Sequence, residues 1–170
     1  PNPEGKGEVS MLDLLVNSLR MRPDRILVGE IRRKREAEVL FEAIHTGHSV
    51  YATVHANDTR ETLTRLTNPP IDIPITMLPA ISMIIVQYRN RRTGIRKTFQ
   101  VSEILPNSEA NVLIQLDIKS GKLRNVNRSK TLLNTIELFT GFSKNELNGS
   151  LKEKENILSM VIQLRDMVTA

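Results

Sequence analysis

A short apolar run between a turn and a lone acidic residue constrains the fold of this 170-residue chain more than any other feature. Pro23-Asp24 precedes Arg25, the apolar run is Ile26–Val28, and Gly29-Glu30 follows it. The run is too short and too β-branched for a helix and is bounded by turn residues, so we expect a buried strand of a parallel sheet. Open α/β folds bind ligands at the carboxyl edge of such a sheet. Glu30 is therefore predicted to stand at a ligand-binding edge.

Helix and strand patterns alternate over the first 68 residues. Apolar residues recur at helical spacing on both sides of the first strand, and they alternate with polar residues from Ser49 to His55. In a strand–helix–strand unit the crossover is right-handed and both strand ends point the same way. Glu30 and His55 are therefore predicted at one edge, on neighbouring strands. The expected elements are helices at about 11–20, 34–46 and 59–67 and strands at 25–30 and 49–55.

The later residues predict two antiparallel β-hairpins or a meander, followed by helices. Turn signals at 92–94 and 119–121 separate stretches rich in β-forming residues. The fold class is therefore predicted as α/β, with a parallel sheet flanked by helices, one or more β-hairpins and a C-terminal helical region. The expected elements are a helical turn at 74–80, strands at 82–89, 96–105 and 111–119, a helix at 131–140, and one or two helices from Ser143 or Ser150 to near Val168.

Composition narrows the class of protein. The chain has no Cys, which excludes a disulfide framework and a thiolate zinc site. No apolar run approaches the roughly 20 residues of a membrane-spanning helix. The chain opens on Pro1 without a Met, and we expect it to be cut from a longer protein.

Positive charge is concentrated in the later part of the chain. Residues 1–68 carry ten basic and ten acidic side chains, whereas residues 89–130 carry ten basic and three acidic ones. Such a surface can face nucleic acid, an anionic membrane or an acidic partner, or it can be a solvated hairpin surface. An aromatic content of only 4% argues against a platform for single-stranded nucleic acid, which needs stacking surfaces.

Three roles are open to Glu30. A carboxylate at the end of a buried strand can act as a general base, bind magnesium, or pair with a nearby arginine. Arg32 and Arg22 are the candidate partners for such a pair. Arg32 is also the best candidate for a phosphate contact, because it leaves the sheet on the same side as Glu30 and a guanidinium matches phosphate geometry.

The two histidines of the second strand region do not suit a shared metal. His48 and His55 stand seven residues apart, which is roughly 20 Å along an extended strand. With three His and no Cys in the chain, we expect no metal site built from histidine ligands. His55 at the ligand edge suits a group that donates a hydrogen bond to a phosphate oxygen.

Two motifs resemble a known family. Arg-Met-Arg-Pro-Asp-Arg-Ile-Leu-Val-Gly-Glu-Ile-Arg at 20–32 resembles the Walker B segment of the secretion ATPases, the motors of type II and type IV secretion, type IV pili and the archaeal flagellum. Thr-Gly-His-Ser-Val-Tyr-Ala-Thr-Val-His-Ala-Asn at 46–57 resembles their His box. The motifs occur in the family's order and at about its separation. The resemblance covers roughly residues 10–90 and is greatest to archaeal members.

The resemblance implies a RecA-like P-loop NTPase core that works as a homo-hexameric ring in the cytoplasm, peripheral to the cytoplasmic membrane. It implies ATP and Mg²⁺ as cofactors, a polytopic inner-membrane platform protein as partner, and no specific nucleic acid. The work done would be secretion or the assembly of filaments like type IV pili or archaella. Residues 1–90 would be a portion of the core, and residues 91–170 a hairpin and helical extension of the same domain.

The resemblance also implies roles for individual residues. By position, Glu30 matches the Walker B glutamate, which activates the attacking water. His48 and His55 match the His box, near the γ-phosphate and in coupling between subunits. Arg32 matches the arginine after the glutamate.

A phosphate-binding loop is missing from the 170 residues, since no Gly-x-x-x-x-Gly-Lys-Ser/Thr occurs in them. In the family this loop lies upstream of the Walker B segment. We therefore expect a C-terminal fragment of a motor ATPase that is inactive by itself. The alternative is a non-enzymatic basic module that binds nucleic acid or an anionic membrane.

Overall fold

The computed structural model describes residues 7 and 9–168. The chain divides into two compact units, Pro1–Ser129 and Lys130–Ala170, and each is described by itself.

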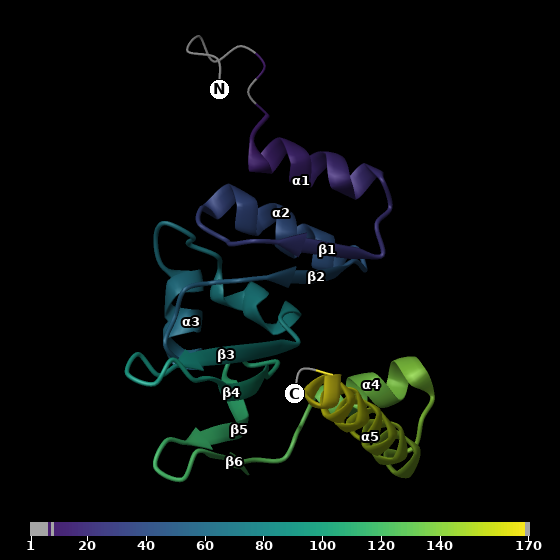
Figure 1. Ribbon diagram of the computed structural model, residues 1–170. Coiled ribbons are helices and arrows are strands. Elements are labelled where there is room, and N and C mark those ends of the chain that lie inside the picture. Colours follow the sequence, from purple (N-terminus) through teal and green to yellow (C-terminus); the bar gives the residue numbers. More distant parts are fainter. Residues whose placement is uncertain (1–6, 8, 169–170) are drawn as a thin grey trace. The chain divides into compact units, whose positions relative to one another are not determined.

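The first unit begins with the alternating elements that the sequence predicts. Strands β1 and β2 pair in parallel, with Ile26 opposite Val50, so the strand–helix–strand unit is confirmed. Their order is α1 (Met11–Arg20), β1 (Arg25–Val28), α2 (Lys34–His45), β2 (Ser49–Ala52) and α3 (Thr59–Thr67) (Figure 1). Both strands are shorter than predicted, because pairing stops before Gly29 and Thr53.

The parallel sheet is buried on one face only. Ile26 packs with Leu15 of α1 and Leu40 of α2 in one core cluster, so α1 and α2 cover that face. Leu27 and Tyr51 point the other way, lie opposite each other in the register, and are 76% and 57% exposed. The predicted buried strand is thus covered on the side of Ile26, which is 5% exposed, whereas Leu27 on its other side is exposed.

A second, antiparallel sheet follows and confirms the meander, one of the two arrangements predicted for these residues. Its strand order is β3-β4-β5-β6, so each strand pairs with its neighbour in sequence (Figure 1). The prediction missed β6, whose four residues are all exposed and carry no alternating apolar pattern. The elements are the 3₁₀ helix η1 (Ile75–Ala80), β3 (Met83–Arg89), β4 (Arg96–Ile104), β5 (Ala110–Asp117) and β6 (Lys122–Asn125).

One core cluster joins the two sheets within this unit. It combines side chains from α2, α3, η1 and β4, among them Phe41, Leu66, Leu78 and Ile104, each at most 4% exposed. Burial of side chains of this size stabilises a fold by about 1.5–3 kcal/mol each. Ile31 and Val54, which follow the two parallel strands, pack against this same cluster, so the edge that carries Glu30 and the antiparallel sheet share one core.

The second unit is helical, as predicted. It consists of α4 (Leu132–Thr140) and α5 (Lys144–Val168), so a single long helix replaces the predicted one or two. Gly141 ends α4 with φ +70°, a conformation that favours glycine. Within residues 7 and 9–168, no helix combines the length and the apolar character that a membrane span requires.

Candidate functional site

Glu30 is held at the ends of both parallel strands by the backbone around it. The Ile31 N–H donates to the Thr53 carbonyl at 3.0 Å, and the Thr53 hydroxyl donates to the Gly29 carbonyl. These two bonds tie the residues that follow β1 to the residues that follow β2. Glu30 is thereby fixed between two anchored neighbours, one on each side of it in the chain.

The carboxylate of Glu30 has one cationic or potentially cationic neighbour at each oxygen. Arg32 Nε donates to Glu30 Oε2 at 2.5 Å, and His55 Nε2 lies 3.3 Å from Glu30 Oε1. The Glu30 side chain is 21% exposed, whereas those of Arg32 and His55 are 73% and 82% exposed. Both partner side chains are therefore largely in contact with solvent, whereas the carboxylate is mostly covered. Of the two arginines considered as partners, Arg32 is the one that pairs with Glu30.

His48 stands apart from this cluster. It precedes β2, and its Nδ1 lies 3.2 Å from both the Ala43 carbonyl and the Thr46 hydroxyl. Because a carbonyl oxygen can only accept, Nδ1 carries the hydrogen and Nε2 of a neutral ring is left as an acceptor. The structure thus joins Glu30, Arg32 and His55 and places His48 at the opposite end of β2.

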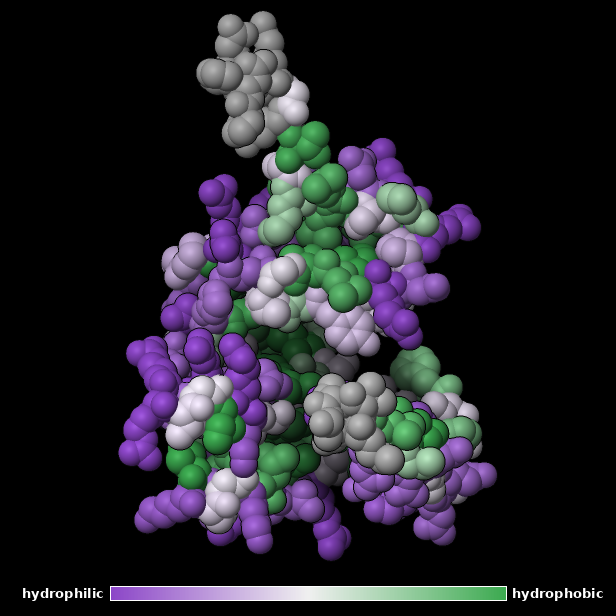
Figure 2. Space-filling view, in the orientation of Figure 1, coloured by the Kyte–Doolittle hydropathy of each residue, from purple (hydrophilic) through white to green (hydrophobic). Residues whose placement is uncertain are grey.

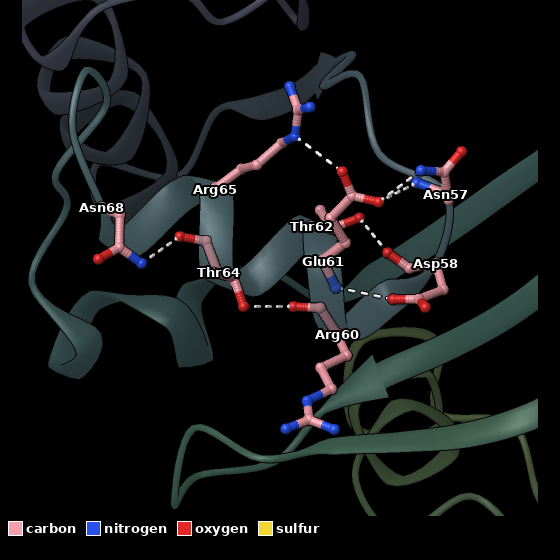
Figure 3. Close-up of polar contacts among 8 residues, drawn as sticks. All are labelled: Asn57, Asp58, Arg60, Glu61, Thr62, Thr64, Arg65 and Asn68. Atoms are coloured by element: carbon pink, nitrogen blue, oxygen red, sulfur yellow. Dashed lines mark hydrogen bonds and ion pairs between the residues drawn. The ribbon is translucent and has the colours of Figure 1, made fainter.

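The loop after His55 is fixed by the first turn of α3. The backbone N–H and the side-chain amide of Asn57 both donate to Glu61 at 2.8 Å, and Arg65 Nε donates to the other oxygen of Glu61 at 3.1 Å (Figure 3). The two Asn57 bonds hold the pKa of Glu61 below its ordinary value. Asp58 caps the helix, since its carboxylate accepts the Glu61 N–H at 2.7 Å (Figure 3). The four-residue spacing of Asn57 and Glu61 is a signal that sequence reasoning missed.

The same helix end is bound to the antiparallel sheet by buried polar groups. The N–H and hydroxyl of Thr59 both lie within 3.1 Å of Gln100 Oε1, and the hydroxyl lies 2.8 Å from Ser102 Oγ. Gln100 in turn donates to Gln115 Oε1 at 2.7 Å. Thr59 is only 2% exposed. No local sequence pattern indicates this network, because Thr59 and Gln100 are 41 residues apart in the chain.

A cleft of about 770 Å³ opens beside the site. Its walls include the consecutive residues 48–56 and 80–87, and so run along β2 and the beginning of β3. Among the strands that the structure describes, β2 pairs only with β1 and β3 only with β4, so each has one unpaired edge. Figure 2 shows hydrophobic side chains deep in the hollow at the centre of the view. His48 and His55 both line this cleft.

Known proteins resemble most of this chain. The family described as Type II/IV secretion system protein matches residues 2–131. An uncharacterized protein of Methanocaldococcus jannaschii is 41% identical over 100 residues, which are 58% of this chain and 37% of that protein. The type IV pilus assembly ATPase PilB of Acinetobacter baylyi is 39% identical over 87 residues, which are 50% of this chain and 15% of PilB.

A putative conjugal transfer protein of Mycobacterium tuberculosis is 48% identical over 66 residues, which are 38% of this chain and 18% of that protein. The chain thus spans well under half the length of each of these three relatives.

Proposed function

Because this chain belongs to the type II/IV secretion system protein family, we propose that it is part of a motor ATPase that drives secretion or the assembly of filaments like type IV pili or archaella. The contact between Glu30 and His55 at the ends of two parallel strands carries the proposal. A carboxylate and an imidazole at such an edge can act together on a water molecule and a phosphate.

In this proposal Glu30 takes the proton of the water that attacks the γ-phosphate of ATP. Its place is fixed by the Thr53 bonds on either side, which is the positioning that phosphoryl transfer needs. His55 and Arg32 move from the carboxylate to phosphate oxygens, which frees both oxygens of Glu30 for the water. His48 acts at the other end of β2, in contact between subunits of a homo-hexameric ring.

The phosphate cradle is expected to come from a segment outside these 170 residues. The relatives are much longer, and the sequence holds no Gly-x-x-x-x-Gly-Lys-Ser/Thr. The cleft between the unpaired edges of β2 and β3 offers such a segment a place to add a strand. ATP would then lie at the carboxyl edge of the enlarged sheet, beside Glu30.

Mg²⁺ fits the reaction class but finds few ligands among the described residues. Mg²⁺ prefers an octahedron of oxygen ligands. The cluster offers a single carboxylate with Arg32 on one oxygen and His55 beside the other, which does not fit a magnesium cage. We therefore assign no step of the reaction to a metal held by these side chains.

The proposal extends to the setting of the motor. The family and its pilus-assembly relatives support a cytoplasmic ring that works against a polytopic platform protein of the inner membrane. Specific nucleic acid is not among the proposed partners.

Glu30→Gln in the full-length protein tests the proposal. The amide keeps the shape of the side chain but cannot take a proton, so ATP turnover should fall by about 100-fold or more while nucleotide affinity stays nearly unchanged. Glu38→Gln is the matched control, because Glu38 is a partly exposed carboxylate paired with Arg35 on α2. Turnover that survives Glu30→Gln would show that another group is the base.

The 170-residue chain itself supplies a second readout. Without a phosphate cradle it should bind a fluorescent ATP analogue weakly and hydrolyse almost no ATP. Tight, magnesium-dependent binding by this chain would contradict the proposed division of the site.

A further inference from the structure

Two hairpin tips at one end of the antiparallel sheet form a strongly positive surface. The β3–β4 tip (residues 89–97) and the β5–β6 tip (residues 117–124) carry eight basic side chains and one acidic side chain. In Figure 1 both tips lie at the left of the sheet, and Figure 2 shows hydrophilic side chains projecting there. Lys97 Nζ donates to the Gly121 carbonyl at 2.8 Å, which joins the two tips into one surface. We call residues 89–97 and 117–124 the tip surface.

Most of this charge has no acidic partner. The acidic residue, Asp117, pairs with Arg124. For the other seven basic residues of the tip surface, the part of the chain that the structure describes contains no ion pair. All eight basic side chains are exposed. They are Arg89, Arg91, Arg92, Arg96, Lys97, Lys119, Lys122 and Arg124. The surface therefore projects a field that attracts an extended anion.

Each tip also exposes an isoleucine among the basic residues. Ile95 is 52% exposed in the first tip, and Ile118 is 61% exposed in the second. Leu123 adds a third apolar side chain that is 54% exposed. Exposed apolar groups next to positive charge suit the boundary between lipid head groups and acyl chains, where the charge meets anionic head groups and the side chain leaves water.

In each tip, one side chain accepts hydrogen bonds from two backbone N–H groups of the turn. In the first tip the Asn90 side chain accepts the N–H groups of Arg92 and Thr93 at 2.9 and 3.1 Å. In the second tip the Asp117 carboxylate accepts those of Lys119 and Ser120 at 2.9 and 3.3 Å. These N–H groups keep their partners when water is replaced by lipid head groups, which lowers the cost of transfer.

We propose that the tip surface binds directly to an anionic lipid bilayer, with the basic side chains on the head groups and Ile95 and Ile118 inserted between them. Nucleic acid fits less well, because it leaves the isoleucines in water and the tips offer no aromatic side chain for stacking. An acidic protein fits less well because two projecting tips require a partner with matching hollows, whereas a bilayer deforms around them. The inference does not depend on ATP hydrolysis.

Sedimentation of the 170-residue chain with lipid vesicles tests this binding. The chain should bind vesicles of about one third phosphatidylglycerol in phosphatidylcholine, and bind pure phosphatidylcholine vesicles weakly. Raising the salt from about 0.05 M to about 0.5 M should weaken the binding, because it shortens the range of the attraction. Arg91→Glu with Arg92→Glu should lower partitioning by about 25-fold or more. Arg60→Glu with Lys154→Glu changes the net charge equally but lies outside the tips, and it should retain most of the binding.

Substitution of the two isoleucines distinguishes insertion of apolar side chains into the bilayer from attraction by charge alone. Ile95→Ser with Ile118→Ser should weaken vesicle binding about tenfold with the charge unchanged. Leu27→Ser with Ile75→Ser is the control, because these side chains are 76% and 61% exposed elsewhere in the same unit and their loss should change binding less than twofold. Ile95→Leu with Ile118→Leu should bind like the unchanged chain, because insertion requires an apolar side chain of this size and not isoleucine itself. A circular dichroism spectrum and a melting temperature close to those of the unchanged chain show that the serine variant is folded.

Three results would overturn the proposal. One is no preference for anionic vesicles, and another is vesicle binding that the isoleucine pair leaves unchanged. The third is binding to duplex DNA that is tighter than vesicle binding at the same salt and is insensitive to the isoleucines. The third result would assign the tip surface to nucleic acid.

Discussion

Two glutamates in the first unit, one at each sheet, differ in how far they are exposed to solvent and in what surrounds them. Glu30, after β1, is 21% exposed and has exposed partners in Arg32 and His55. Glu103, in β4, is fully buried and accepts hydrogen bonds from Asn111 Nδ2 at 2.7 Å and Ser129 Oγ at 2.8 Å. A carboxylate whose partners can leave is free to act on a substrate, whereas one enclosed by the fold can only hold it together. The parallel sheet thus carries its acidic side chain at an accessible edge, whereas the antiparallel sheet encloses its own in the core.

The largest expected effect comes from removing the enclosed carboxylate. Glu103→Ala should lower the free energy of unfolding by about 3–5 kcal/mol, because it removes a buried acceptor that Asn111 and Ser129 both use and opens a cavity. Glu30→Ala should lower it by less than about 1 kcal/mol, since its ion pair with Arg32 is largely exposed to solvent. Urea unfolding of both variants measures the difference. Equal losses in the two variants would remove the contrast between the sheets.

The sequence predicted that Glu30 and His55 share one edge of the sheet, because the signals for this placement are local. A turn, three apolar residues and Gly29-Glu30 lie within eight positions, and the strand–helix–strand order is enough to bring His55 to the same edge. The enclosed Glu103 was not predicted. Its burial depends on Ser129, which is 26 residues further along the chain, and on a neighbouring strand.

Two further features of the fold were not predicted, because they too depend on contacts that a local sequence pattern does not show. The exposed face of β1 at Leu27 escaped prediction, because a short apolar run does not tell which of its faces another element covers. The fourth strand, β6, escaped prediction because it is held by pairing with β5 and buries none of its own residues.

The first turn of α3 contacts both the loop after β2, through Glu61, and the antiparallel sheet, through Thr59. A substitution at Thr59 measures how much the contact with the antiparallel sheet stabilises the fold. Thr59→Val keeps the shape of the side chain but removes the hydroxyl that meets Gln100 and Ser102. We expect a loss of about 1–3 kcal/mol of unfolding free energy, because those buried groups lose a partner. Thr64→Val, five residues further along and on the exposed face, is the control and should cost less than about 0.5 kcal/mol. A loss no larger than that of Thr64→Val would show that the Thr59 hydroxyl does not hold the start of α3 on the antiparallel sheet.

The smallest expected effect concerns the exposed side of the same turn. The Asn57 bonds lower the pKa of Glu61 in the folded chain, so the unfolded chain binds the proton more readily. The resulting stability is present above the ordinary pKa of glutamate and is lost as the pH falls through the lowered value. Glu61→Gln has no carboxylate to titrate, so its melting temperature should lie below that of the unchanged chain near neutral pH.

The difference in melting temperature should shrink steadily as the pH falls from about 6 to about 3. Because Glu61 holds the loop that carries His55, the unchanged chain should lose the order of this loop over the same range, while the Thr59 network keeps the helix on the sheet. Hydrogen exchange at the Asn57 amide, compared with exchange at the Thr59 amide, measures the two separately. Protection that falls equally at both amides would mean that the loop after β2 and the start of α3 open as one unit, and that Glu61 does not hold this loop separately from the antiparallel sheet.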